Sequence, residues 1–491
     1  MLDPCCSPCE HSPMKIKSTL IFVLSILANT SQADNSVLNL PNLGDASSGI
    51  VSLPQEHDLG QRFLRSVRSQ VISMDDPLLV DYLEHLVYRL SSFSEVEDHR
   101  LYIILIKNPL INAFAAPGGV IGVNHGLFLN AESHHEMSAI LAHELAHLSQ
   151  RHFARGIESG KKSGVITIAG LLAGAILASA GEGDAGLAAL SLSQGLAQTQ
   201  QLSYSRTREA EADRIGITTM INADIDPRAM AYIFERLDRL TRYSGDLIPE
   251  FLRTHPVTRL RIADAYNQTE SLTKKKWPLD LNYQLMRTRA IVLSHDPKEA
   301  LALFRKNNNS KNPVQAIAHQ YGRALALTLT GEIREAEQLI SSLRKNAQNN
   351  IAYQIAEAKL LAADHNPKAA VKLLEASLNI NPGNYPLAMA RAELLIQLKR
   401  PGEASQTLSE LSQSRPDDET VWYHLAEALG LANDISGVHQ ARAEYFVLNG
   451  DFDQAIKQLG YALPLVRQNF QASAKIKQRI EEVWNLKAGS E

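Results

Sequence analysis

The sequence predicts an α+β domain that is mostly helical and contains a small sheet, followed by an all-α solenoid of paired helices. Three observations lead to this fold class. Helix formers run without Gly or Pro from Met137 to Leu148. β-Branched and aromatic residues gather at 101–106. Alanines recur at steps of about 34 residues beyond residue 281. At 491 residues the chain is long enough for two or three domains.

The N-terminal part has the pattern of a cleavable export signal at 14–33. A short basic stretch precedes an apolar stretch that is too short to span a bilayer, and we expect cleavage after Ala33. Met14 is then the expected start, so that residues 1–13 are not part of the protein. We expect a mature chain without disulfides, because its cysteines all precede Met14: Cys5, Cys6 and Cys9.

The overall composition excludes one class of partner. The net charge of −4 is nearly neutral for this length, which argues against nucleic acid or a strongly anionic surface. The apolar fraction of 45% is ordinary for a globular protein.

The first domain is expected to open with helices between about 53 and 90, where apolar residues are periodic. A strand follows at 101–106. Two further apolar segments, 113–115 and 120–123, flank the turn residues at 117–119, which is typical of a hairpin. We expect this small sheet to pack against the next helix.

That helix carries His143, Glu144 and His147 in the order HExxH. Residues four apart lie on one helical face, one turn from each other, so both imidazoles can reach a single zinc ion. Glu144 lies beside them and can take a proton from the attacking water. A buried helix with incidental histidines is the alternative.

A second helix near 208–214 offers the third ligand. Glu209, Ala212, Asp213 and Gly216 share a face that is acidic but otherwise small, and it can therefore pack closely on the first helix. We predict Glu209 as the ligand and Asp213 as the acceptor of the outer N–H of a ligand histidine. Glu211 lies on another face and is expected to form a surface ion pair with Arg214.

These motifs resemble a family of zinc metalloproteases that includes the heat-shock protease HtpX, the prenyl-protein proteases and the mitochondrial Oma protease. The resemblance rests on HExxH with the E-x-x-x-D helix, on Asn112–Gly119, and on Thr254-His255-Pro256 followed by Arg259 and Arg261. It implies a gluzincin-type protease domain at 34–275 with one zinc ion. It also implies that strand 112–116 holds the substrate backbone, with an ordinary sheet strand as the alternative.

The resemblance further implies a regulatory role for His255. Pro256 disfavours helix at this position, and a loop imidazole there could take the fourth zinc position and exclude water. A loop histidine bonded to nearby backbone is the alternative. Arg261 is a weaker candidate for stabilising the anionic intermediate, and a structural salt bridge is equally compatible with the sequence.

Two sets of residues outside the metal-site motifs give less specific predictions about function. The uncharged segment 164–180 is rich in Gly, Ala and Ile, and we expect a lid over the metal site, with a membrane-touching hairpin as the alternative. Four further histidines have no ligand spacing and are expected on the surface or in loops: His125, His134, His135 and His152.

The C-terminal part, 280–491, is expected to be a tetratricopeptide-repeat domain. Small residues recur with the period of this repeat, at Ala324, Ala358, Ala392 and Ala426, and about 12 residues later at Ala336, Ala370 and Ala404. Ala443 and Ala455 repeat the pair out of register, which predicts a non-standard end. A solenoid of this kind has a concave binding surface for proteins.

Together these features predict an exported zinc endopeptidase with a helical-repeat receptor. The resemblance implies a place in the periplasm, with unfolded or stalled outer-membrane proteins as substrates, the β-barrel assembly machinery as partner of the repeats, and peripheral contact with the outer membrane. A chaperone or scaffold with a vestigial metal site is the competing hypothesis. A purely structural zinc site is a third hypothesis. It is disfavoured because only three protein ligands are evident outside the His255 loop, which leaves one coordination position of the zinc open.

Overall fold

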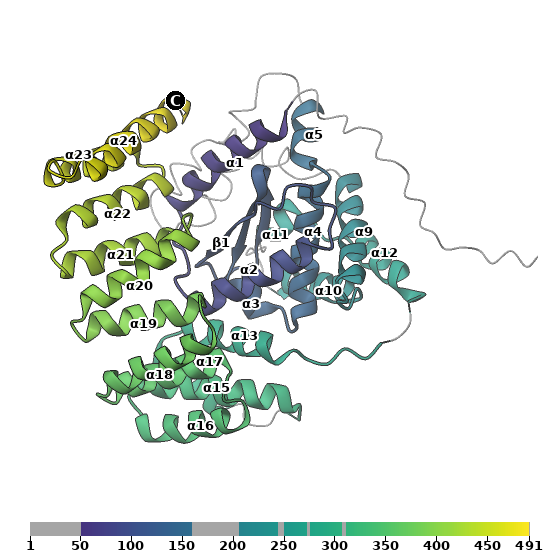
Figure 1. Ribbon diagram of the computed structural model, residues 1–491. Coiled ribbons are helices and arrows are strands. Elements are labelled where there is room, and N and C mark those ends of the chain that lie inside the picture. Colours follow the sequence, from purple (N-terminus) through teal and green to yellow (C-terminus); the bar gives the residue numbers. More distant parts are fainter. Residues whose placement is uncertain (1–50, 160–205, 244–249, 273–274, 307–310, 491) are drawn as a thin grey trace, which may run out of the picture. The chain divides into compact units, whose positions relative to one another are not determined.

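The structure is a computed structural model, and it describes residues 51–159, 206–243, 250–272, 275–306 and 311–490 (Figure 1). The expected export signal at 14–33 and the segment 164–180 lie outside the described residues. No described helix is both long enough and apolar enough to cross a membrane.

The sheet has three strands in the order β1-β3-β2. The strands are β1 (Tyr102–Ile106), β2 (Ala113–Ala116) and β3 (Val120–Asn124). β3 is parallel to β1 and antiparallel to β2. The expected hairpin is therefore present, and its turn is a short 3-10 segment, η2 (Pro117–Gly119). Gly118 and Gly119 have φ values of 71° and 80°, a region in which glycine avoids the strain of a side chain.

Two helices cover the two faces of this sheet. α1 (Leu53–Arg68) packs on the face that carries Ile104 and Ile106. α2 (Pro77–Ser91) lies on the other face, where Leu101 and Leu105 join its core. The alternation follows from the two-residue period of a strand, and it leaves the edges of the sheet uncovered by these helices.

The remaining elements of the α+β part are helices that surround the HExxH helix (Figure 1). The HExxH helix is α4 (His134–Ser149), and the others are α3 (Gly126–Asn130), α5 (His152–Ser159), α9 (Arg206–Asn222), α10 (Ala229–Tyr243), α11 (Glu250–Thr254) and α12 (Arg259–Glu270). α4 contacts α2, β2, α9 and α10, so it lies at the centre of this part.

The C-terminal part is a solenoid of antiparallel helices, as the alanine period predicted. Its helices are α13 (Leu281–Leu293), α14 (Pro297–Lys306), α15 (Pro313–Thr330), α16 (Ile333–Asn346), α17 (Ile351–Ala363), α18 (Pro367–Ile380), α19 (Tyr385–Gln397), α20 (Pro401–Ser414), α21 (Glu419–Leu431), α22 (Ile435–Leu448), α23 (Phe452–Leu465) and α24 (Phe470–Ser490). All seven periodic alanines are buried between paired helices.

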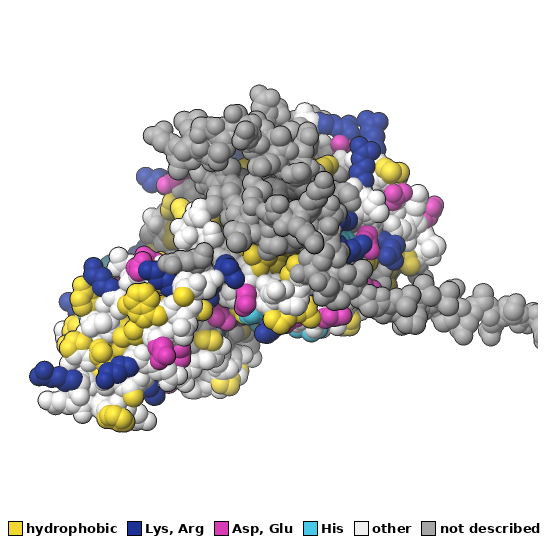
Figure 2. Space-filling model, turned by 90° about the horizontal axis from the view of Figure 1, so that it is seen from above, with side chains coloured by type: hydrophobic (Ala, Val, Ile, Leu, Met, Phe, Trp, Pro, Cys, Tyr) yellow, Lys and Arg dark blue, Asp and Glu magenta, His cyan; other side chains and the backbone are white. Residues whose placement is uncertain are grey.

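The last three helices form the non-standard end that the broken register predicted. Ala443 on α22 and Ala455 on α23 are buried in a small core of their own, separate from the main one. Large apolar side chains remain exposed on α23 and α24, including Tyr461, Phe470 and Trp484. Figure 2 shows hydrophobic side chains among Lys and Arg at this end of the molecule.

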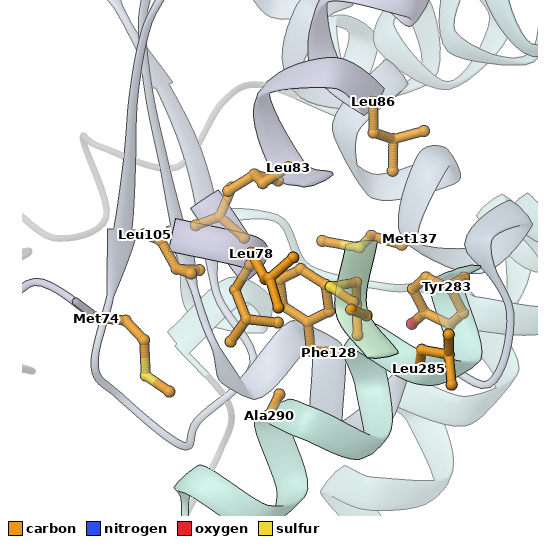
Figure 3. Packing of buried hydrophobic residues seen from close by; sticks show 14 of the residues in the cluster. Met74, Leu78, Leu83, Leu86, Leu105, Phe128, Met137, Tyr283, Leu285 and Ala290 are labelled. Atoms are coloured by element: carbon orange, nitrogen blue, oxygen red, sulfur yellow. The ribbon is translucent and has the colours of Figure 1, made fainter. Parts of the chain in front are cut away.

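One hydrophobic core runs through both parts of the molecule. Figure 3 shows Leu78 and Phe128 from the α+β part beside Tyr283 and Ala290 from α13. The Tyr283 hydroxyl donates to the carbonyl of Ala131 at 2.9 Å. The predicted division at 275–280 thus falls in the connection before α13, while the packing is continuous across it.

A buried ion pair ties the solenoid to the first part. Arg289 on α13 donates to both carboxylate oxygens of Asp76 at 2.6–3.0 Å, and each residue is 4% exposed. Asp76 also caps α2 by accepting from the Leu79 amide at 3.1 Å. Burial alone would raise the pKa of Asp76, but Arg289 holds this pKa below its usual range.

Replacing Arg289 by Met should lower the free energy of unfolding by about 3–5 kcal/mol, because Asp76 would stay buried without its counter-charge. Chemical denaturation measures the change. The control is Arg305→Met, which removes a pair with Glu332 whose side chains are 47% and 42% exposed, and which should cost less than about 1 kcal/mol. Equal effects would show that the buried pair is not a stabilising link.

Candidate metal centre

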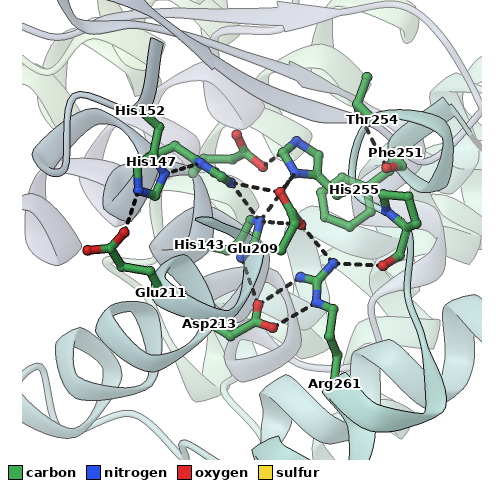
Figure 4. A network of polar contacts seen from close by, with 12 residues as sticks. His143, His147, His152, Glu209, Glu211, Asp213, Phe251, Thr254, His255 and Arg261 are labelled. Carbon is green, nitrogen blue, oxygen red and sulfur yellow. Dashed lines mark hydrogen bonds and ion pairs between the residues drawn. The ribbon is translucent and has the colours of Figure 1, made fainter. Parts of the chain in front are cut away.

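The helix α4 is buried over most of its length. Ser133 caps it by accepting from the Glu136 amide, and all residues from 135 to 147 are buried. His143 and His147 project from one face, one turn apart, and their Nε2 atoms lie 3.0 Å from each other (Figure 4). The two histidines therefore meet as the spacing predicted.

α9 packs against this helix through the small acidic face expected from the sequence. Glu209, Ala212 and Asp213 on this face are at most 4% exposed. A side chain at Gly216 would meet the His143 nitrogen at 3.2 Å and the Ala142 carbonyl carbon at 3.3 Å. Glycine at this position lets the two backbones approach closely enough for Glu209 to reach the histidines.

Four side chains converge on one point: His143, His147, Glu209 and His255. Their donor atoms all lie within 4.8 Å of one another. Glu209 oxygens are 3.5 Å from His143 Nε2 and 3.4 Å from His147 Nε2. His255 Nδ1 is 3.0 Å from Glu209 Oε1 and 3.3 Å from His143 Nε2.

These separations fit a small tetrahedral metal ion. Nitrogen and oxygen ligands about 2.0–2.1 Å from zinc lie about 3.4 Å from each other in a tetrahedron. The two imidazoles and the carboxylate of α4 and α9 are the donor types that zinc takes in hydrolytic enzymes. The residues present therefore fit one metal ion.

The electrostatics of the cluster favour a cation at this point. Burial would lower the pKa of His143, but hydrogen bonds to Asp213 and Glu209 raise it to about 9. Burial raises the pKa of the Glu209 carboxyl, whereas His255 and His143 lower it. The net effect is a strong lowering of this pKa. Burial takes the pKa of His147 well below its usual value. The carboxylates of Glu209 and Asp213 therefore stabilise positive charge at the centre of the cluster, whether a proton on His143 or a metal ion carries it.

Asp213 and Arg261 support the cluster from the side away from His147. Asp213 Oδ1 lies 2.9 Å from His143 Nδ1, which fixes the ring with Nε2 toward the cluster. Arg261 donates to both Asp213 oxygens at 2.7 Å and lies 2.8 Å from Glu209 Oε2. Burial would raise the pKa of Asp213, but His143 and Arg261 lower it. Arg261 is thus engaged in a buried ion pair, the alternative that the sequence left open.

Glu144 faces the cluster on the side of β2. It is 1% exposed, and its Oε1 lies 3.5 Å from His255 Nε2. Burial raises the pKa of its carboxyl. His255, His143 and the Ala115 amide on β2 lower this pKa, but burial has the larger effect. Among the described strands, β2 has a neighbour on one side only, so none of them pairs with its outer edge beside Glu144.

Two expectations for the side of His147 were wrong. His152 is fully buried rather than at the surface, and its Nδ1 lies 2.7 Å from Nδ1 of His147. Glu211 contacts His152 Nε2 at 3.0 Å and Arg155 at 3.6 Å, instead of forming a surface pair with Arg214. His152 and Glu211 can therefore fix the ring of His147 as Asp213 fixes that of His143.

The sequence did contain a signal for His152. It is the first residue of α5, just after α4 ends, and Arg151 has a φ of 47° that turns the chain back beneath His147. A histidine directly after a metal-binding helix is within reach of the last ligand. His125 lies in the turn between β3 and α3, as expected for a loop histidine, although it is only 3% exposed. His135 is buried inside α4 at 7% exposure, contrary to the expectation, and both residues lie outside the cluster.

Comparison with known proteins defines the class. Residues 77–269 match the model of peptidase family M48, and residues 361–429 match that of the tetratricopeptide repeat. The first match contains the whole cluster and the second lies in the solenoid. The chain is a metallopeptidase that carries tetratricopeptide repeats.

Full-length relatives define the family more closely. The chain is 29% identical over 470 residues to the β-barrel assembly-enhancing protease of Escherichia coli K12, covering 96% of each chain. It is 30% identical over 453 residues to a putative β-barrel assembly-enhancing protease of Vibrio cholerae, covering 92% of this chain and 93% of the relative. The mitochondrial metalloendopeptidase OMA1 of Schizosaccharomyces pombe is 30% identical over 207 residues, 40% of this chain and 58% of the relative. The chain belongs to the family of β-barrel assembly-enhancing proteases.

If Glu209 is a ligand, Glu209→Gln should weaken metal binding by more than the roughly 10–100-fold that loss of an outer partner costs. Glu211→Gln is the matched control, because the new amide oxygen can still accept from His152. Metal content and competition with a chelating dye measure both. A Glu211→Gln protein that loses metal while Glu209→Gln keeps it would overturn the assignment.

Proposed function

We propose that the protein is a periplasmic zinc endopeptidase in which His143, His147 and Glu209 hold the zinc ion and Glu144 is the general base. The observation that carries the proposal is the convergence of these donor atoms within 4.8 Å, with Glu144 buried beside them next to the edge strand β2. Asp213 acts through His143, whose ring it orients.

The zinc ligands, strand β2 and Glu144 would each have a separate role in peptide hydrolysis. Zinc held by the three ligands would act as a Lewis acid and polarise the scissile peptide carbonyl. The edge of β2 would align an extended substrate by main-chain hydrogen bonds. Glu144 would take the proton of the attacking water and pass it to the leaving amine.

The proposed substrates are unfolded or stalled outer-membrane proteins, and the proposed role of the repeats is to bind the β-barrel assembly machinery. The names of the full-length relatives support this setting, and the solenoid supplies the protein-binding surface. The export signal expected at 14–33 supports the periplasmic location, and peripheral contact with the outer membrane belongs to the same proposal. A scaffold with a vestigial site is disfavoured, because all three ligands and the base are present and buried.

Replacing Glu144 by Gln should reduce proteolysis by about a thousandfold or more, because it removes the base and keeps the ligands and side-chain size. Cleavage of unfolded casein by the zinc-loaded protein measures activity, and metal content verifies that the site is intact. Equal cleavage by both proteins would refute the mechanism. Absence of cleavage by either protein, even with a stalled barrel protein as substrate, would favour the scaffold.

We further propose that His255 holds the enzyme inactive. It follows the last residue of α11, as Pro256 predicted, and its Nδ1 is the fourth donor of the cluster. Phe251 packs on its ring with 4.9 Å between centroids. An imidazole in the fourth position would exclude the attacking water, so that withdrawal of the α11 loop would activate the enzyme.

His255→Ala should therefore raise proteolysis, including self-cleavage, by at least several-fold. Adding Glu144→Gln should abolish the increase. Self-cleavage of the single and double variants is followed over time, with His295→Ala as control because His295 is exposed on the solenoid. A His255→Ala protein less active than the unaltered one would show that His255 serves catalysis or folding instead.

A further inference from the structure

The outer edge of β1 borders a cavity of about 260 Å³ between the sheet and the solenoid. This volume is near the lower end of ligand clefts, about 300 Å³. The cavity is lined by Leu101–Leu105, by Arg68 of α1, by Tyr88 of α2 and by residues 414–420, which join α20 to α21. Because α1 and α2 cover opposite faces of the sheet, a cavity that both border lies at the edge.

The backbone of β1 offers strand-pairing groups to this cavity. The carbonyl of Leu105 accepts from the Met74 amide at 2.8 Å, and that of Leu101 accepts from the Tyr88 hydroxyl at 3.1 Å. Groups of alternate residues point the same way, so the N–H and C=O of Ile103 also face this edge. Among the described residues, the only strand-like pairing here is one bridge between Ser73 and Ile106. In the described part of the chain, no strand thus pairs with this edge from Tyr102 to Ile104, although the Leu101 carbonyl is already bonded to Tyr88.

The charge of the cavity favours a basic occupant. Five carboxylates line it, against two guanidinium groups. Arg415 lies 2.6 Å from Glu84, and Arg68 lies 3.0 Å from Glu419. Within the described part of the chain, no Arg or Lys pairs with the carboxylate of Asp417, whose backbone carbonyl accepts from Arg68. Arg415 is also shared with Asp418, at 2.9 Å. Most of the excess negative charge therefore lies on the 414–420 side, and the rest is on Asp75.

We propose that this edge binds an extended polypeptide segment by strand addition to β1, with a Lys or Arg side chain of the segment next to Asp417. Main-chain hydrogen bonds would give affinity for many sequences, and the carboxylates would select basic ones. The inference deepens the proposed function by giving the protease a second substrate site. It rests on that function only in taking unfolded polypeptide as the ligand.

Peptide binding to the full-length, zinc-loaded Glu144→Gln protein tests the proposal. The probe is a fluorescein-labelled peptide of Val, Thr and Lys, compared by anisotropy with the same peptide carrying Glu for Lys. The Lys peptide should bind more tightly. Hydrogen exchange should show slower exchange of the Ile103 amide when it binds.

Two substitutions separate the backbone and charge contributions. Ile103→Pro removes an N–H that faces the edge, where proline is tolerated, and should weaken binding about tenfold, as expected for the loss of one or two hydrogen bonds. Ile103→Val keeps the N–H and is its control. Asp417→Lys should reverse the preference toward the Glu peptide, and Glu410→Lys, an exposed change on α20 away from the cavity lining, should not.

The outcomes are distinct. If Ile103→Pro fails to fold, Asp417→Lys decides. Equal binding of the Lys peptide by the Asp417→Lys and Glu410→Lys proteins overturns the proposal. So does loss of binding in Ala115→Pro but not in Ile103→Pro, because the peptide would then lie on β2. Casein cleavage by proteins that keep Glu144 is measured separately. Normal cleavage without peptide binding at β1 would refute this inference and leave the proposed protease function intact.

Discussion

The approach of α9 to α4 at Gly216 is the constraint on which the metal centre depends. With the backbones this close, Glu209 and Asp213 are forced under His143 and His147, away from water. Buried carboxylates are costly unless they are paired. Arg261 and the imidazoles supply that pairing in the structure. The face of α9 therefore requires positive charge at its centre, and a metal ion would meet the same need.

This charge requirement links the proposed latch to the metal site. His255 contacts both Glu209 and the side of Glu144, so an imidazole there stabilises the two carboxylates while it fills the space that water would need. Withdrawing it would leave Glu144 with fewer partners in a buried site. A substrate or water that hydrogen-bonds to Glu144 would compensate for that loss. If His255 acts as proposed, the closed state would be favoured when no ligand is present, which is the behaviour expected of a protease that must spare its neighbours.

The sequence predicted the features that depend on helical periodicity. Spacings of three and four residues place His143 with His147, and Glu209 with Asp213 and Gly216, whatever the rest of the fold does. It could not predict contacts set by the tertiary path. His152 reaches His147 only because the chain reverses at Arg151. The pair of Asp76 with Arg289 joins residues 213 positions apart, and no local pattern marks either as a partner of the other.

The order of the sheet gives its two edges different surroundings. β2 lies beside Glu144, whereas β1 faces the connection between α20 and α21. With strands about 4.8 Å apart, the two edges of the three-stranded sheet are separated by about 10 Å. A segment held on β1 would be out of reach of Glu144, although a flanking part of the same chain could extend to β2. The solenoid is anchored next to β1 by the Arg68 and Arg415 pairs. The same contacts that fix the repeats on the protease thus also shape the site where a chain could be held without being cut.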